Sequence, residues 1–356
     1  MKHFIFTLLA VLLSTAAFAQ NQETPNEVKL TTDKSNPHPV NIAFGQTKLS
    51  LFGYAQSTYA VENKNHETTN GFEVQRIILM SQLDINKRLG FFIMYDFNSA
   101  KLHEYWAKYT FAPELEIRIG QMKQPFTLEN LMPPTLLSVV RMNQSVAYLA
   151  GIAGDPCFGN WVGRDAGIML TGSLLPHNGR HLLQYNLGIF NGAGMNQKEN
   201  NSQKDVIGML NYMPTKDITL SSSFILGTGH ALVDSPYGAF KAGDNYKRNR
   251  WSAGVEAKTK PAYLRGEWLQ GNDGGIHSRG GYVDAEIHVA KKLDIIADYN
   301  YLQKNNDIKA STTHTYTGGL QYWLYKQCRI QTEFSYAKQI DGPASRLWIT
   351  QFQVAF

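Results

Sequence analysis

Residues 282–289, Tyr-Val-Asp-Ala-Glu-Ile-His-Val, alternate without a break between aromatic or polar side chains at even positions and aliphatic ones at odd positions. A period of two is typical of a strand with one polar and one apolar face. Such stretches run about ten to fourteen residues here, longer than the usual 5–6. That length suits a tilted strand that crosses a bilayer. The same period occurs in residues 116–120, 216–224 and 329–336.

The alternation from residue 48 onward predicts about sixteen strands, the even number that a barrel entered and left from the periplasm requires. Long and short connections then alternate, as in outer-membrane barrels, and the longest predicted loops are 61–71, 125–160, 192–203 and 229–248. The predicted strands are 48–60, 72–86, 90–98, 102–111, 115–124, 161–174, 181–191, 204–213, 217–228, 249–259, 262–270, 279–290, 293–303, 313–324, 328–338 and 346–356.

Composition excludes several other classes of protein. Only 2 of the 356 residues are Cys, too few for a disulfide scaffold or a cysteine-rich zinc site. A formal charge of +5 without a basic tail does not suggest nucleic-acid binding. Beyond the N-terminus no apolar run reaches the ~18 residues of a spanning helix. The prediction is an all-β transmembrane antiparallel barrel; a soluble sandwich or propeller, which also alternates, is the alternative.

The N-terminus has the pattern of a secretory signal peptide. Lys2 supplies the positive charge, an apolar run follows, and residues 17–19 read Ala-Phe-Ala, a cleavage site. We therefore expect residues 1–19 to be removed near Ala19, and residues 20–47, polar and with three prolines, to form a flexible periplasmic lead-in. Residues 48–356 would form the barrel, in a Gram-negative outer membrane.

The last strand ends on an aromatic residue. Trp348, Phe352, Val354 and the terminal Phe356 share its apolar face. A terminal aromatic on an alternating final strand looks like the signal that the outer-membrane assembly machinery reads. Phe356 is therefore the predicted assembly signal.

One stretch is similar to a known family. Residues 118–129 read Arg-Ile-Gly-Gln-Met-Lys-Gln-Pro-Phe-Thr-Leu-Glu, which resembles a strand of the phosphate-selective porin O and P family that ends in Gly-Gln-x-Lys-x-Pro-Phe. Shorter matches are residues 72–76, 163–167, 191–194 with Asn196, and 204–205. The family-motif residues are Gly120, Gln121, Lys123, Pro125, Phe126 and Glu129.

This resemblance implies a sixteen-stranded trimeric porin whose third outer loop folds into the lumen. The longest predicted loop, 125–160, independently follows the fifth strand and is therefore the third outer loop. Its apolar residues 136–149 suit packing inside the barrel. Permeants would be inorganic anions such as phosphate or polyphosphate, and outer-membrane lipid and lipopolysaccharide would surround the barrel.

An anion pore needs fixed positive charge at its narrowest point. The constriction candidates are Lys123, Arg141 and Arg164. In a regular strand Lys123 would share the lipid-facing side of Ile117 and Ile119, so it must lie above the lipid band or follow a bulge. Alternation along the other strands predicts that inward acids outnumber inward bases. Alternatively, these inward charges form acid–base pairs that only line a water-filled lumen and do not select ions. The inward basic candidates are Arg76, Lys108, Arg118, Arg265 and Arg329; the inward acids are Asp84, Asp96, Glu104, Glu116, Glu256, Glu267, Asp284, Glu286, Asp294, Asp298 and Glu333.

The phosphate-specific members of this family are known for a column of arginines that leads anions through the channel. This sequence has only scattered inward arginines, and Met209 follows the Lys204–Asp205 pair where family members often have a basic residue. The sequence therefore predicts a diffusion channel that leans toward anions, with a general or cation-leaning porin as the alternative. A barrel enzyme or a closed structural barrel is a weaker alternative. No hydrolase, zinc-protease, P-loop or dinucleotide motif occurs, so we expect neither catalysis nor a metal or cofactor.

Overall fold

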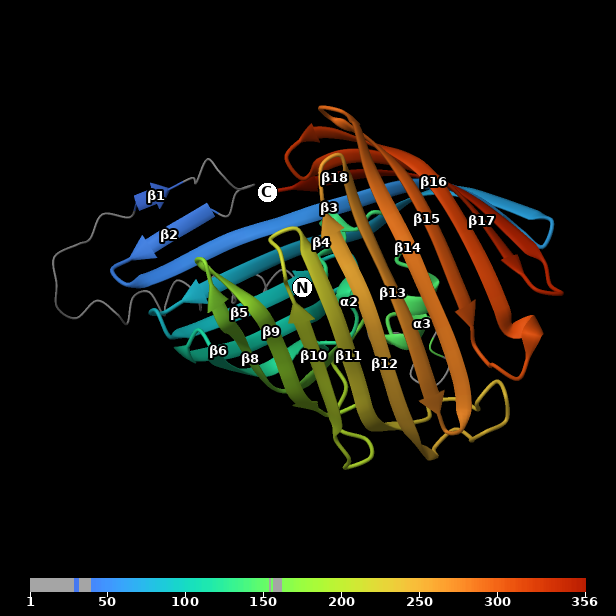
Figure 1. Cartoon of the computed structure of the whole chain (residues 1–356), viewed down its shortest axis with the longest axis horizontal. Coiled ribbons are helices and arrows are strands. Elements are labelled where there is room, and N and C mark those ends of the chain that lie inside the picture. The colour runs from blue at the N-terminus through green and yellow to red at the C-terminus, as the bar shows by residue number, and fades with distance from the viewer. Residues whose placement is uncertain (1–28, 32–39, 154, 156–161) are drawn as a thin grey trace.

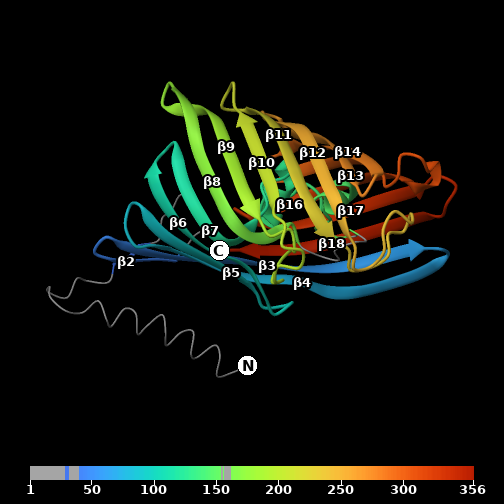
Figure 2. The same cartoon turned by 90° about the horizontal axis from the view of Figure 1, so that it is seen from below.

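The computed structural model describes residues 29–31, 40–153, 155 and 162–356. Within these residues, eighteen strands form one antiparallel sheet, and β3–β18 close it into a barrel of sixteen (Figures 1 and 2). This confirms the predicted fold. The barrel strands are β3 (Thr47–Lys64), β4 (Glu67–Asp84), β5 (Leu89–Asp96), β6 (Lys101–Ala112), β7 (Leu115–Lys123), β8 (Arg164–His177), β9 (Arg180–Phe190), β10 (Asp205–Tyr212), β11 (Ile218–His230), β12 (Asn245–Lys258), β13 (Ala262–Asp273), β14 (Ile276–Ala290), β15 (Leu293–Gln303), β16 (Thr312–Tyr325), β17 (Cys328–Gln339) and β18 (Ala344–Ala355).

The barrel closes where its last strand meets its first. β18 pairs with β3 from Ala355 opposite Tyr54 to Ser345 opposite Lys64. Phe356 then exchanges two backbone hydrogen bonds of 3.0 Å with Gly53. The C-terminal residue therefore belongs to the seam itself, and its role as an assembly signal stays a prediction.

Two short strands precede the barrel. β1 (Lys29–Thr31) pairs with β2 (Val40–Phe44), and β2 pairs with Thr47–Leu51 of β3, beyond the end of β18. Part of the segment expected to be flexible, residues 20–47, therefore lies in strands, and β2 satisfies the edge of β3 that β18 leaves open. The predicted signal peptide, residues 1–19, lies outside the described residues.

The first outer connection is much shorter than predicted. The loop expected at 61–71 is a two-residue turn at Asn65 and His66, both with positive φ (53° and 67°), as in a type I′ hairpin. Residues of β3 and β4 near this turn are mostly polar on both faces. Hydrophobic alternation therefore fades there, although the ladder of hydrogen bonds continues.

The two faces of the barrel differ as the alternation predicts. On β18, Trp348 and Phe352 are exposed on the outer face, whereas Gln351 and Gln353 are buried on the inner face. The apolar outer face suits lipid contact. No helix in the described residues has the length and apolar character that a membrane span requires.

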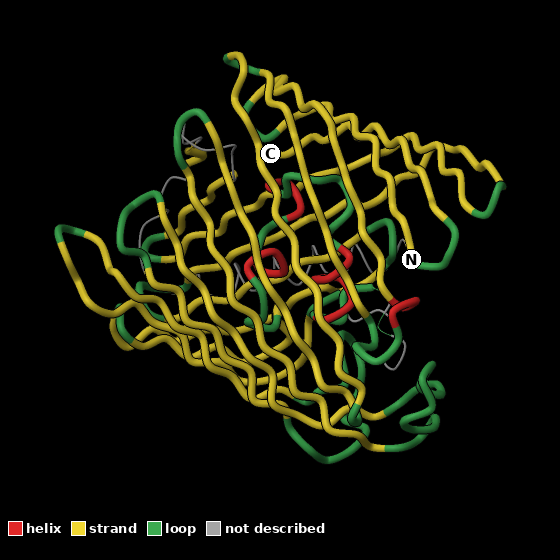
Figure 3. Tube along the Cα trace, turned by 45° about the vertical axis from the view of Figure 1, so that its right-hand side comes forward, coloured by secondary structure: helices red, strands yellow, loops and turns green. Residues whose placement is uncertain are grey.

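The longest connection, residues 124–163 between β7 and β8, is called the long connection below. It contains α2 (Leu128–Leu131), the 3-10 turn η1 (Pro134–Leu136) and α3 (Gln144–Leu149), which are surrounded by strands in Figure 3. Another 3-10 turn, η2 (Lys309–Ser311), precedes β16. Side chains of the long connection form an apolar core with inward residues of β6, β8–β11 and β13–β15; its own members include Phe126, Val146, Tyr148 and Leu149.

Candidate functional site

The long connection is hydrogen-bonded to inward side chains of β17 and β18. Arg329 donates to the Leu137 carbonyl at 2.8 Å, and Gln331 donates to the Ser138 carbonyl at 2.6 Å. In the other direction, the Val140 backbone N–H donates to the Glu333 carboxylate at 3.0 Å. This wall of the barrel thus supplies both donors and acceptors to the polar backbone of a non-regular segment.

Glu267 on β13 holds the start of α2. Its two carboxylate oxygens accept the backbone N–H groups of Leu128 at 2.8 Å and Glu129 at 3.2 Å, and one of them also accepts the Tyr282 hydroxyl at 2.8 Å. Acceptance by a carboxylate satisfies N–H groups that the first turn of a helix leaves free. Two acids of the predicted acidic wall, Glu267 and Glu333, therefore bind backbone N–H groups of the long connection.

Arg265 and Arg329 point inward, as their parity predicts, but the long connection covers both. Arg265 pairs with Asp284 at 2.5 Å, and the Glu129 carboxylate lies 3.8 Å from the same guanidinium group. Arg329 additionally donates to Gln321 at 2.7 Å. These two arginines, predicted to line the lumen, therefore anchor the long connection and are 1% exposed.

Glu129, a family-motif residue, is fully buried in α2. Its carboxylate accepts the Asn143 side-chain N–H at 3.2 Å, a contact within the long connection. Burial raises the pKa of Glu129 to about 8, while the nearby Arg265 opposes that rise. The charge of this residue therefore depends on how closely the long connection stays packed.

A second group of predicted residues comes together on the opposite wall, on β4 and β6–β8. We call Arg76, Lys108, Arg118, Lys123 and Arg164 the basic cluster. Lys108 is directly opposite Arg118, and Lys123 is opposite Arg164, in the ladder of neighbouring strands. Arg76 and Arg164 lie close enough to Lys123 to interact with its charge.

Two carboxylates pair with the basic cluster. Glu116 lies 2.7 Å from Arg118 and 3.6 Å from Lys108, and Glu104 lies 2.9 Å from Arg164. Among the described residues, no carboxylate lies within ion-pair distance of the two remaining bases, Arg76 and Lys123. The five bases of the basic cluster thus outnumber the two carboxylates that pair with them.

Lys123 follows an irregular residue of β7, Gly120. Its φ is +138°, a conformation that L side chains rarely adopt, and an added Cβ would lie 2.2 Å from the Tyr105 carbonyl oxygen. Beyond this irregular residue, the Lys123 ammonium group donates to the Met132 carbonyl of the long connection at 2.7 Å. The side chain therefore does not share the lipid-facing side of Ile119, which is 56% exposed.

A cavity of about 210 Å³ lies against the basic cluster. Lys123 and Arg118 line it together with Glu104 and Asn186. The remaining lining is apolar and consists of Trp106, Met122, Pro125, Leu131 and Met169.

Arg141 is placed apart from the basic cluster. Its guanidinium group lies 3.5 Å from the Glu62 carboxylate near the outer end of β3, and its side chain is half exposed. The structure therefore brings two of the three constriction candidates, Lys123 and Arg164, together and leaves the third at the outer side.

Arg248 and Arg250 are inward anchors that the sequence analysis missed: Arg248 fell in the predicted loop 229–248, and Arg250, in the predicted strand 249–259, was not among the inward bases. Both belong to β12 and are buried, and Arg248 pairs with Asp205. Arg250 pairs with Asp273 at 2.8 Å and donates to the Leu149 carbonyl of α3 at 2.6 Å. The alternation of these arginines with the outward Trp251 was the available signal.

Three of the four short family matches, all but residues 72–76 on β4, meet at the outer ends of β7–β10. Asp165 accepts the backbone N–H of Gly192 at 2.6 Å, and a Cβ on Gly192 would lie 2.9 Å from the Asp205 carboxylate. Gln121 exchanges hydrogen bonds of 2.7 and 3.1 Å with Asn196. These motif residues therefore join strands and loops.

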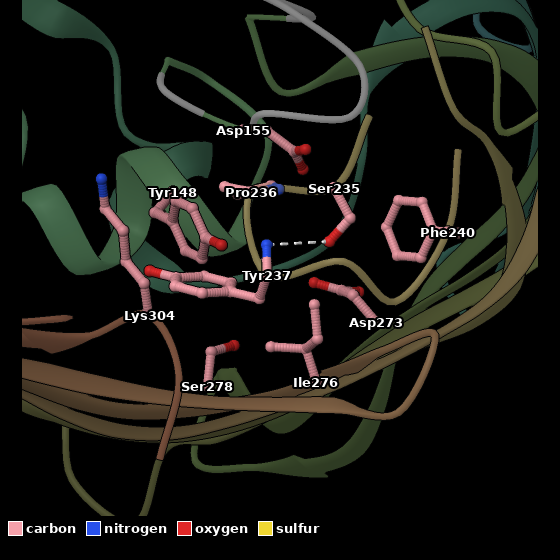
Figure 4. A pocket seen from close by; sticks show the side chains of 10 residues that line it. All are labelled: Tyr148, Asp155, Ser235, Pro236, Tyr237, Phe240, Asp273, Ile276, Ser278 and Lys304. Carbon is pink, nitrogen blue, oxygen red and sulfur yellow. Dashed lines mark hydrogen bonds between the residues drawn. The ribbon is translucent and has the colours of Figure 1, made fainter. Parts of the chain in front are cut away.

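The outer end of α3 is covered by residues 231–244, the connection between β11 and β12. Figure 4 shows Tyr148 of α3 beside Tyr237 and Lys304, and the Lys304 ammonium group lies 5.4 Å from the centre of the Tyr148 ring. The cavity among these residues is about 10 Å³, room for about one water. Packing is therefore much tighter here than beside the basic cluster.

Comparison with known proteins supports the fold. Searching the curated proteins gave no match. Among solved structures, an anion-selective porin from Comamonas acidovorans matches with a TM-score of 0.65 and 15% identity, over 87% of this chain and 100% of that one. The outer membrane channel DcaP of Acinetobacter baumannii matches with a TM-score of 0.64 and 10% identity, over 88% and 99%. The trimer form of OmpT from Vibrio cholerae gives 0.61 and 10%, over 86% and 99%.

The family model described as phosphate-selective porin O and P matches residues 51–140, which confirms the resemblance predicted from the sequence. That range includes β3–β7 and the first part of the long connection. The chain therefore has the fold of a porin, and over residues 51–140 it matches the phosphate-selective porin O and P family.

Proposed function

We propose that the chain is an outer-membrane porin through which small hydrophilic solutes diffuse. A closed barrel of sixteen strands satisfies every strand edge, and its apolar outer face and polar inner face are what a bilayer and a watery lumen require. The family match and the porin structures support the same function.

The pore prefers anions, because the two charged walls differ in what their charges do. On β13 and β17, Glu267 and Glu333 are bound to backbone N–H groups of the long connection. On the opposite wall, Arg76 and Lys123 carry positive charges that no carboxylate among the described residues pairs with. A fixed surplus of positive charge in a low-dielectric passage raises the local concentration of anions. This surplus is the observation that carries the proposed preference.

The remaining expectations follow from the porin function. The chain would reach the outer membrane after cleavage near Ala19, with the assembly machinery reading Phe356, and lipopolysaccharide would contact the outer face. A homotrimer is supported by the likeness to a porin solved in trimer form. Phosphate is a candidate permeant on the strength of the family match. A general or cation-leaning pore is the alternative that inward acids such as Asp298 favour.

Channel activity is tested by swelling of proteoliposomes in isotonic solutions of uncharged sugars of increasing size. We expect swelling with small sugars and none with large ones. Liposomes that swell no faster than protein-free controls would contradict the porin function and favour the alternative of a closed structural barrel. Turnover on lipid or peptide substrates would instead support an enzyme.

Anion preference is tested with Lys123→Gln, which removes one unpaired charge and keeps a hydrogen-bond donor for the Met132 carbonyl. The matched control is Lys338→Gln, because Lys338 is exposed near the outer end of β17. In planar bilayers under a KCl gradient, Lys123→Gln should shift the reversal potential toward potassium, and the control should not. Equal behaviour of both variants would show that the basic cluster does not set selectivity.

A further inference from the structure

The cavity beside the basic cluster combines positive charge with an apolar lining. Two bases, Arg118 and Lys123, lie at the same space as Met122, Leu131 and Met169. Its volume of about 210 Å³ is far more than the ~10–15 Å³ that one water needs. We propose that this cavity binds small organic carboxylates with a flat apolar body, in preference to inorganic phosphate. The proposal rests on the anion preference proposed above and names the class of anion.

The polar groups of the cavity have hydrogen-bond capacity left for a carboxylate. The Lys123 ammonium group has three N–H donors, and the Met132 carbonyl occupies one of them. Arg118 uses its Nε to donate to Glu116 at 2.7 Å, which leaves the paired terminal N–H groups suited to a planar carboxylate. The Asn186 side chain, also in the lining, has no hydrogen bond within the described residues.

The arginine is held in place before any ligand arrives. Its guanidinium carbon lies 4.7 Å from the centre of the Trp106 ring, and that ring stacks on Phe92 with 5.0 Å between centroids. A donor fixed by an ion pair and a ring loses little freedom on binding. The acidic member of the lining, Glu104, is already paired with Arg164 at 2.9 Å, which reduces its repulsion of an anion.

The apolar part of the lining is what separates an organic anion from phosphate. Phosphate presents oxygens in every direction, so contact with Met122, Leu131 and Met169 would leave some of them without hydrogen-bond partners. A carboxylate on a flat apolar body directs two oxygens to Arg118 and Lys123 and its carbons to the methionines and leucine. Methionine adapts its shape to such bodies.

The test is block of single-channel current by benzoate, acetate, phosphate and the neutral benzamide, each added to the refolded full chain. Benzoate should block at a concentration about fivefold or more below that of acetate or phosphate, the gain expected from burying a few apolar groups. Benzamide should block weakly, because it lacks the charge. Block by phosphate as strong as that by benzoate, or by benzamide as strong as that by benzoate, would overturn the proposal.

Leu131→Gln tests the apolar contact with little change of size, since Leu131 lies at the surface of α2 and is only partly buried. The matched control is Leu136→Gln, a 40% exposed leucine of the same long connection outside the cavity lining. Leu131→Gln should raise the half-blocking concentration of benzoate about fivefold and leave that of phosphate unchanged; equal effects in both variants would contradict the site.

The KCl reversal potential of the same channels separates the two proposals. If the reversal potential lies on the chloride side but benzoate blocks no better than phosphate, the carboxylate site is contradicted and the proposed anion preference stands. A reversal potential on the potassium side would contradict the proposed anion preference, and with it the carboxylate site that rests on that preference.

Discussion

Gly120 is an irregular residue of β7 that lies between Arg118 and Lys123, two members of the basic cluster. Its φ is +138°, and three residues later Lys123 lies opposite Arg164, although simple alternation would put Lys123 with the lipid-facing isoleucines. The sequence analysis stated this conflict and offered two solutions, a position above the lipid band or a bulge; the ladder of β7 has no register shift between Gly120 and Lys123, where the strand ends. The family motif has a glycine at position 120, where the backbone conformation disfavours any side chain.

We expect Gly120→Ala to destabilise the barrel by about 2 kcal/mol or more, because the strained φ and the close Tyr105 carbonyl act together. The control is Gly71→Ala on β4, where an added Cβ has nothing within 4 Å. Urea unfolding followed by the shift in electrophoretic mobility of the folded barrel measures both. Equal midpoints for the two variants would show that β7 accommodates a side chain at residue 120.

Glu129 predicts a pH dependence of stability. Burial raises its pKa from 4.5 to about 8, so the folded chain holds this proton more tightly than the unfolded chain does. Its stabilising contribution is therefore present at low pH and is lost as pH rises from about 4.5 through about 8. Arg265 opposes the rise, and Asp284 and Glu267 add to it.

The urea midpoint of the wild type should fall between pH 6 and pH 9, and Glu129→Gln should make that fall smaller. Glu114→Gln, an exposed carboxyl in the turn between β6 and β7, is the control. A fall of the same size in the Glu129 variant would mean that other groups cause the pH dependence.

At the scale of elements, strands were predictable and the long connection was only partly so. Alternation placed most ends within a few residues; β15, for example, runs over Leu293–Gln303 as predicted. Apolar and polar residues alternate only where one face of a strand meets lipid and the other meets the lumen. The pattern therefore does not reveal a strand where both faces meet water, as near Asn65. It also failed at Arg248, whose buried partner Asp205 lies on another strand.

The site was predicted as a set of charges but not as a set of pairs. Parity predicted that Arg265 and Arg329 line the lumen, and only contacts between distant strands and the long connection show that both are covered. The same contacts change the meaning of Glu267 and Glu333 from pore charges to anchors. Counting inward acids and bases therefore could not give the selectivity.

Glu267→Ala should loosen the long connection, because two backbone N–H groups and the Tyr282 hydroxyl lose their acceptor, at about 1–3 kcal/mol for each buried group left unpaired. We expect faster tryptic cleavage after Arg141 and a noisier single-channel current. Glu73→Ala, at an exposed carboxyl near the outer end of β4, is the control. Unchanged cleavage and current in Glu267→Ala would mean that the other contacts suffice to hold the connection.

The whole molecule is a barrel divided into two walls by one connection. On β13–β18, inward polar residues bind the long connection and are buried by it. On β4 and β6–β8, the basic cluster keeps a positive surplus next to a cavity. One segment therefore binds Glu267 and Glu333 of the acidic wall, and on the proposed function the surplus of bases on the other wall is what an entering ion meets.

The most direct test of this account is the reversal potential of the refolded wild-type chain in a planar bilayer under a steep KCl gradient. Stepwise conductance with a reversal potential on the chloride side is the predicted result, because unpaired bases and not buried acids face the passage. Stepwise conductance with a potential on the potassium side would contradict the division of charges between the two walls, and absence of conductance would contradict the pore.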